Sequence, residues 1–113
     1  RWNDTEVFEP RGHMTDYLTE QAVAAIRANR NRPFFMYLAH GAPHTPIAAT
    51  REDYEMLSHI EDHTERVYAA MVMQLDRGVG RILQTLQEEG LDNDTLIIFT
   101  SDNGGAYYLG LAD

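Results

Sequence analysis

Apolar residues recur at intervals of three or four over two long stretches of the chain, which predicts two amphipathic helices. The first covers residues 15–29 and ends shortly before Pro33, because the residue before a proline disfavours the helical region. The second covers residues 64–89, and Gly90 fits the C′ position that follows a helix. A short polar helix or turn is expected between them, over residues 51–58.

Two shorter stretches are almost continuously apolar or β-branched, which is typical of strands buried on both faces of a sheet. They cover residues 34–39 and 95–100 and flank the long predicted helix. A strand–helix–strand unit is almost always a right-handed crossover that joins parallel strands. The pattern therefore predicts an α/β fold, in which a helix precedes one βαβ unit of a mostly parallel sheet flanked by helices.

Two glycines interrupt the long predicted helix, at Gly78 and Gly80. Each costs about 1 kcal/mol relative to alanine in a helix interior. We therefore expect another element to pack closely against the helix at this point. His13 lies just before the first predicted helix and is expected to be a solvated loop residue.

The charge balance of the chain is acidic, with a net charge of −9 and nine basic residues that are all arginine. This balance argues against nucleic acid or an anionic membrane surface as a partner. No apolar run reaches the roughly 18 residues that a membrane span needs. The absence of cysteine excludes a disulfide framework, a thiolate metal site and a cysteine nucleophile within these residues.

Polar residues follow both predicted strands. Residues 40–46 contain His44 between two prolines, and residues 101–105 contain Asp102 and Asn103 before two glycines. Because parallel strands end at the same edge of a sheet, where α/β proteins bind their ligands, these features are expected to be neighbours. Carboxylate and amide oxygens suit a hard cation such as Ca²⁺. The alternatives are a tight Asn-Gly turn and a proline-rich connection with an exposed histidine.

Taken together, these stretches resemble the central part of a type I sulfatase, a family within the alkaline-phosphatase superfamily. The resemblance runs from about residue 12 to residue 110 and rests on the order and spacing of several pieces. These pieces are Thr15-Asp16, Pro33-Phe34-Phe35-Met36-Tyr37-Leu38, Ala42-Pro43-His44-Thr45-Pro46, Tyr68-Ala69-Ala70-Met71-Val72, Leu75-Asp76 with Val79-Gly80, and Phe99-Thr100-Ser101-Asp102-Asn103-Gly104-Gly105.

The resemblance implies roles for three residues. Asp102 and Asn103 match positions that help to bind a calcium ion in the family. His44 matches the histidine that contacts the sulfate group and assists the leaving-group oxygen. The implied substrate is a sulfate-ester small molecule or a sulfated glycan, and the implied location is periplasmic or secreted. Residues 1–113 would then be part of one catalytic domain, truncated at both ends, whose oligomeric state stays open.

The family nucleophile has no counterpart in this chain. Sulfatases use a formylglycine made from the first residue of a Cys/Ser-x-Pro-x-Arg motif, whereas the only serines here, Ser58 and Ser101, lie in other contexts. The lysines that contact sulfate in the family are also missing. The chain by itself is therefore expected to be inactive. Three alternatives remain: a phosphodiesterase or phosphonate hydrolase of the same superfamily, a non-catalytic remnant that binds calcium, and a purely structural α/β domain with no site.

Overall fold

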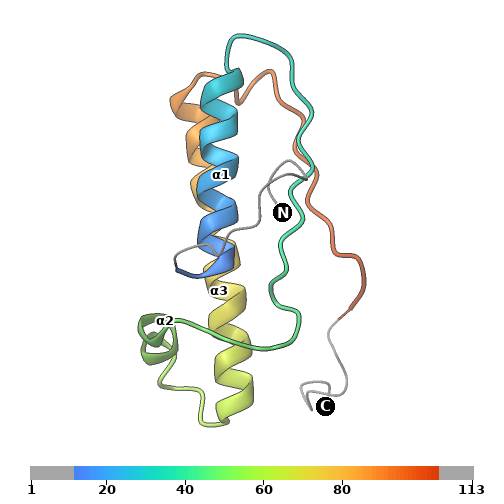
Figure 1. Ribbon diagram of the computed structural model, residues 1–113. Helices are drawn as coiled ribbons and strands as arrows, with labels where there is room; N and C mark the ends of the chain where they lie inside the picture. The colour runs from blue at the N-terminus through green and yellow to red at the C-terminus, as the bar shows by residue number, and fades with distance from the viewer. Residues whose placement is uncertain (1–11, 105–113) are drawn as a thin grey trace.

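The computed structural model describes residues 12–104 and contains three helices in that range. Helices α1 (Met14–Asn29) and α3 (His63–Glu88) lie side by side and run in the same direction, while the short α2 (Arg51–Met56) lies near the first turns of α3 (Figure 1). The predicted helices over residues 15–29, 51–58 and 64–89 are thus confirmed. None of the helices in residues 12–104 has the length and hydropathy to cross a membrane.

Local sequence signals set the ends of the helices. The Thr50 hydroxyl accepts a hydrogen bond from Asp53 N at 3.1 Å before α2, and the carboxylate of Asp62 caps α3. Gly90 follows α3 with a φ of 69°, and Leu91 N donates to the Leu86 carbonyl at 2.8 Å. This bond closes a Schellman motif, which needs a left-handed residue at the C′ position. The sequence-based assignment of Gly90 is confirmed.

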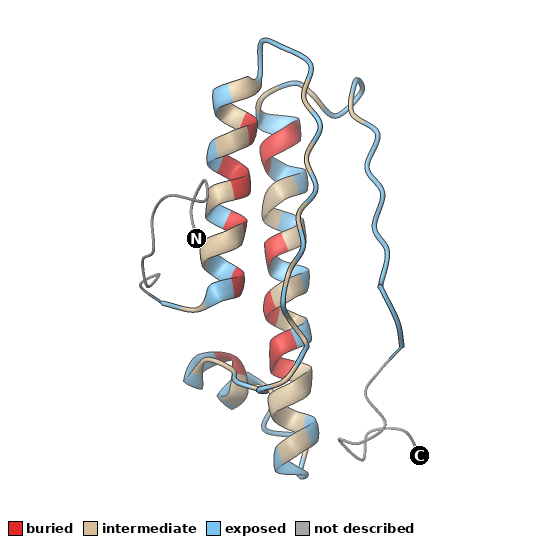
Figure 2. Cartoon of the chain, turned by 45° about the vertical axis from the view of Figure 1, so that its right-hand side comes forward, coloured by how far each residue is buried: buried red, intermediate tan, exposed pale blue. Residues whose placement is uncertain are grey.

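The core of the described chain lies between α1 and α3, whose buried residues face each other (Figure 2). Its apolar members are Ala22, Val23, Ile26, Ala70, Met71 and Leu86. At Gly78 an added Cβ would lie 2.5 Å from Thr19 Oγ1, so the close packing expected there is confirmed. The same expectation is wrong for Gly80, where nothing lies within 4 Å of an added Cβ.

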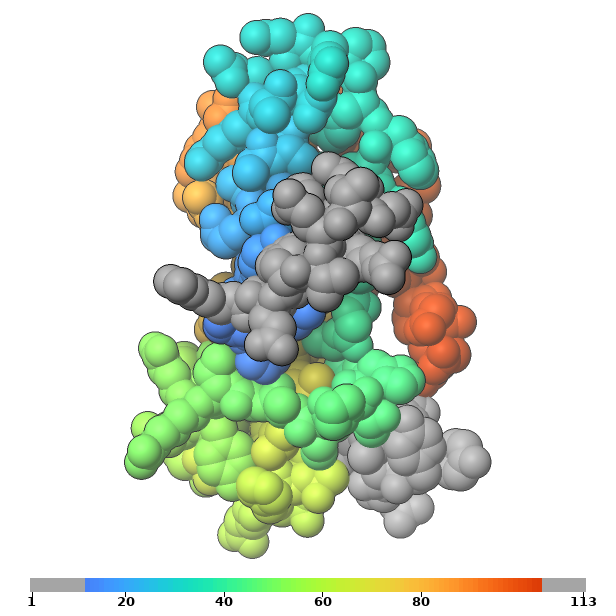
Figure 3. Space-filling view, in the orientation of Figure 1, coloured from blue at the N-terminus to red at the C-terminus, as the bar shows by residue number. Residues whose placement is uncertain are grey.

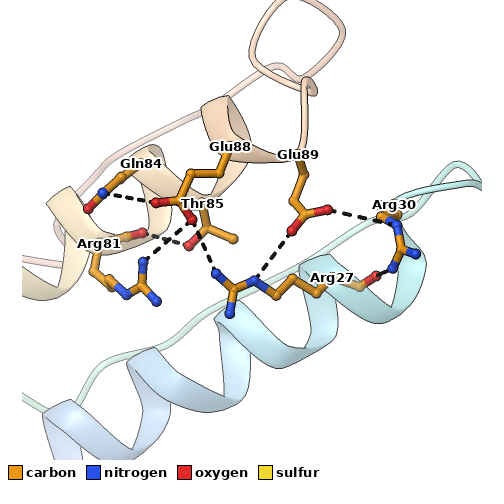
Figure 4. A network of polar contacts seen from close by, with 7 residues as sticks. All are labelled: Arg27, Arg30, Arg81, Gln84, Thr85, Glu88 and Glu89. Atoms are coloured by element: carbon orange, nitrogen blue, oxygen red, sulfur yellow. Dashed lines mark hydrogen bonds and ion pairs between the residues drawn. The ribbon is translucent and has the colours of Figure 1, made fainter.

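Ion pairs join the C-terminal ends of the two long helices (Figure 4). Arg27 of α1 lies 3.1 Å from Glu88 and 3.4 Å from Glu89. Arg30 and Arg81 lie near the same two carboxylates, each at 3.8 Å. These side chains are partly exposed, so the network adds modestly to stability and mainly aligns the helix ends.

The two predicted strands form extended segments without strand pairing, because the structure describes no strand within residues 12–104. Both segments return along the helices in the direction opposite to α1 and α3 (Figure 1). An extended segment, α3 and a second extended segment therefore follow one another in the order of the predicted βαβ unit. The predicted sheet itself is not confirmed.

The prediction that both faces of these segments are buried is wrong for the described chain. Phe35 is 93% exposed and Leu96 is 86% exposed. Residues 34, 36, 38 and 40 are half-buried while the residues between them are exposed, which is the period of two expected for extended backbone. The helices cover one face of this segment, and no second layer lies within residues 12–104 to cover the other.

Candidate functional site

The loop after the first extended segment carries His44. Its backbone N–H donates to the Gly41 carbonyl at 2.9 Å, which closes a turn, and its Nδ1 lies 2.7 Å from the Thr45 carbonyl oxygen. A carbonyl oxygen only accepts, so the proton of the neutral ring is on Nδ1. Nε2 of this exposed side chain is then the nitrogen available to a ligand.

A hollow of about 360 Å³ lies between this loop and the start of α1. Its lining includes His13, His44 and Met71. The Nε2 atom of His13 lies 2.9 Å from the Ala48 carbonyl oxygen, so the prediction of a solvated loop residue is wrong. Thr15 and Asp16 are the cap candidates in the sequence, whereas the structure has His13 at the N-cap, so no local signal marks this bond.

His40 lies on the same side of the extended segment as its half-buried residues. Both ring nitrogens are buried and have no hydrogen-bond partner within residues 12–104. This burial lowers the pKa of His40 below its ordinary value of 6.5, so the imidazole is neutral at pH 7. A neutral, half-buried ring packs as part of the apolar face, and we assign it no chemistry.

The C-terminal end of the His44 loop is fixed by α2. Thr50 caps this helix, and its hydroxyl donates to Asp53 Oδ2 at 2.7 Å. The Arg77 guanidinium beside Asp53 holds the pKa of this buried carboxyl below its ordinary value of 3.8. The composition of residues 51–58 did not reveal this ion pair, because Asp53 looks like any other acidic residue of a polar helix.

Asp102 and Asn103 lie in an exposed turn after the second extended segment. Asn103 N donates to Asp102 Oδ1 at 2.9 Å, and Asn103 Nδ2 donates to the Gly104 carbonyl at 2.9 Å. The Ser101 hydroxyl donates to the Asn103 carbonyl. Asp102 Oδ2 and Asn103 Oδ1 therefore take part in none of these hydrogen bonds and remain available to coordinate a cation. Gly105 lies outside the described residues.

The two predicted halves of the site lie toward the same end of the helical pair. The segments that lead to them run in the same direction, although they diverge when the molecule is turned (Figures 1 and 2). The space-filling view shows residues 95–104 at the outer edge of this face (Figure 3). No residue of this turn lines the hollow beside His44. Within residues 12–104, no three His, Asp or Glu side chains form a group that could hold a metal.

A family model described as "Sulfatase" matches residues 1–111 of this chain. The chain belongs to the sulfatase family. It is 39% identical over 97 residues to the "Uncharacterized sulfatase YdeN" of Escherichia coli (strain K12), covering 83% of this chain and 17% of that protein. It is 34% identical over 96 residues to the N-acetylgalactosamine-6-sulfatase of Mus musculus, with the same two shares. The chain thus spans about a sixth of the length of these sulfatases.

The fold of this sulfatase-family chain is similar to a solved structure. That structure is the crystal structure of Ps i-CgsB in complex with k-i-k-neocarrahexaose, with a TM-score of 0.89 and 38% sequence identity. The match covers 95% of this chain and 24% of the other. The arrangement of helices and extended segments is therefore one that occurs inside a longer folded protein.

Proposed function

We propose that this chain supplies part of the active site of a sulfatase, which hydrolyses a sulfate ester. Membership of the sulfatase family supports the reaction class. The observation that supports the proposal is the common direction of the two extended segments, because the loops that follow them, residues 40–46 and 101–104, lie toward the same end of the helical pair (Figure 1). In α/β proteins, ligands bind at that end of the strands.

In this proposal His44 contacts the sulfate group and acts as the acid for the departing alcohol. Its Nδ1–H is bound to the Thr45 carbonyl at 2.7 Å, which orients the ring. When the ring carries a proton on both nitrogens, the proton on Nε2 would be donated to the ester oxygen as the nucleophile bonds to sulfur and the S–O bond breaks, so that the product leaves as an alcohol and not as an alkoxide.

Asp102 and Asn103 fit a calcium ion in the chemistry of their donors. Each keeps one side-chain oxygen that no described hydrogen bond uses, and calcium binds carboxylate and amide oxygens. Calcium takes about six to eight oxygens, so residues beyond the described chain must complete the set. A calcium ion held here would supply positive charge for the sulfuryl oxygens.

We further propose that the nucleophile is a formylglycine outside these 113 residues. The chain has no cysteine, and neither of its serines begins a Ser-x-Pro-x-Arg motif.

The substrate class that we favour is a sulfated sugar. The names of the N-acetylgalactosamine-6-sulfatase relative and of the neocarrahexaose complex support that class. For the intact protein we propose a periplasmic or secreted location.

A chimera tests this function. Residues 12–104 would replace the matching segment of the mouse N-acetylgalactosamine-6-sulfatase, and sulfate release from sulfated sugars would be followed. We expect activity that falls at least a hundredfold in His44→Ala and Asp102→Ala. The unaltered mouse enzyme and an Asp92→Ala chimera are controls, because Asp92 is an exposed acid of the turn after α3. Full activity of a folded His44→Ala chimera would contradict the role of His44.

A further inference from the structure

Ala48, in the loop that carries His44, is hydrogen-bonded to side chains at the start of α1 and in α3. Its carbonyl oxygen accepts from His13 Nε2 at 2.9 Å, and its N–H donates to Met71 Sδ at 3.3 Å. His13 precedes α1, whereas Met71 lies in the buried face of α3. Both backbone polar groups of Ala48 are thus bound by side chains far away in the sequence, so the loop has a defined position at this point.

His13 occupies the N-cap of α1, yet its side chain makes no capping hydrogen bond. A Ser, Thr, Asp or Asn at this position would stabilise the helix by about 1 kcal/mol. His13 instead binds a carbonyl oxygen 35 residues further along the chain. Its hydrogen bond therefore serves the loop and not the helix.

The ring of His13 has one protonation pattern in this arrangement. A carbonyl oxygen only accepts, so Nε2 carries the proton and Nδ1 carries the lone pair when the ring is neutral. Nδ1 is buried and has no partner within residues 12–104. The same ring lines the hollow that His44 also lines. The side chain of His13 is thus directed at the loop by its hydrogen bond to Ala48.

We propose that His13 is a positioning residue for His44: by holding the Ala48 carbonyl, it fixes the loop and with it the place of the His44 ring. Three residues separate His44 from Ala48, and one of them is Pro46, which has a fixed φ. A shift at Ala48 is therefore passed on to His44. The inference rests on the proposed function for the importance of His44, but the geometry can be measured without substrate.

Nuclear magnetic resonance of the isotopically labelled 113-residue chain tests the proposal. His13→Ala removes the donor, whereas His13→Gln keeps an N–H that can reach Ala48. The Ala48 N–H itself donates to Met71 Sδ, so we expect it to exchange about tenfold faster in His13→Ala because the loop opens more often once the bond to the Ala48 carbonyl is lost. We also expect the ring signals of His44 to shift, and both effects to be reversed in His13→Gln. His59→Ala is the matched control, because His59 is an exposed histidine between α2 and α3.

The proposal is overturned if His13→Ala leaves the Ala48 exchange and the His44 ring signals unchanged, or if His13→Gln behaves as His13→Ala does. Faster exchange at the core residues Ile26 and Leu86 would reveal general unfolding of a variant. In that case the ring ¹⁵N shifts of His13 are measured in the unaltered chain. The proposal requires the Nε2–H form of this ring, and an Nδ1–H form refutes the contact with Ala48. These measurements involve no hydrolysis, so their failure is distinct from that of the chimera.

Discussion

Asp53 and Arg77 form a two-point ion pair between α2 and α3, with Asp53 Oδ1 2.7 Å from Arg77 Nη1 and Oδ2 3.0 Å from Nη2. The Asp53 side chain is 1% exposed, whereas that of Arg77 is 53% exposed. The Thr50 hydroxyl also donates to Oδ2, so both oxygens of the buried carboxylate have partners. The pair ties α2, and through it the end of the His44 loop, to α3.

Removing the cation of this pair is expected to destabilise the chain. Arg77→Gln leaves the Asp53 carboxylate buried without its charged partner, and we expect a loss of about 2 kcal/mol in the free energy of unfolding. Urea unfolding followed by circular dichroism measures it. Arg51→Gln is the control, because its ion pair with Glu55 is exposed and should contribute less than about 0.5 kcal/mol. Equal losses in the two variants would refute this account.

The same pair predicts an acid-sensitive fold. Arg77 holds the pKa of Asp53 below 3.8, so the unfolded chain takes up a proton at a pH where the folded chain does not. The stability from this group is complete above about pH 5 and is lost as the pH falls from about 4 through the lowered pKa. Urea unfolding at several pH values should show a shallower acid loss in Asp53→Asn. An identical slope in the two proteins would exclude Asp53 as a cause.

Two glycine substitutions in α3 should act in opposite directions. Gly78→Ala places a Cβ against Thr19, whose hydroxyl also donates to the Thr15 carbonyl at 2.9 Å, and we expect a loss of about 1–3 kcal/mol. Gly80→Ala meets no neighbour and should stabilise the helix by about 1 kcal/mol. Thermal unfolding distinguishes them. Combining Gly78→Ala with Thr19→Ala should recover part of the loss, and its failure to do so would place the clash elsewhere.

The proposed calcium ligands predict weak binding by the chain alone. Two side-chain oxygens are fewer than calcium needs, so we expect a Kd of about 1 mM or weaker. Amide shifts of Asp102 and Asn103 on titration with calcium chloride would measure it. Asp102→Ala should abolish the shifts and Asp92→Ala should not. Binding that survives Asp102→Ala would argue against this turn as the site.

The 113-residue chain alone is expected not to hydrolyse an aryl sulfate. The chain has no cysteine and no serine in a Cys/Ser-x-Pro-x-Arg context, so it offers no residue for conversion to formylglycine. Turnover of a chromogenic aryl sulfate, compared with a mock purification from the same cells, is the measurement. Steady turnover that co-purifies with the chain and is lost in His44→Ala would contradict the expectation.

Helix positions could be predicted because their signals are local. The period of the apolar residues, the proline at position 33 and the glycine at position 90 lie within or beside the helices that they define. The predicted first helix therefore begins one residue after α1 does, and the predicted long helix begins and ends one residue after α3 does. The partner of Gly78 was expected from the cost of a helical glycine, but the same reasoning failed at Gly80.

Less of the candidate site than of the helices could be predicted from the sequence. The types of residue at positions 44, 102 and 103 and their places after extended segments follow from the sequence, while their roles stay proposals. The bonds from His13 to Ala48 and from Arg77 to Asp53 join residues 35 and 24 positions apart. No local pattern marks such pairs, because they form only when separate helices and loops are packed together.

The sequence by itself determined the helices, their ends, the extended character of residues 34–39 and the resemblance to sulfatases, since each depends on residues close together or on a fixed order of motifs. Tertiary structure alone decided which side chains anchor the His44 loop and which faces of the extended segments are covered. Burial depends on what packs against a segment, and an apolar run such as residues 95–100 is exposed where no neighbouring layer covers it.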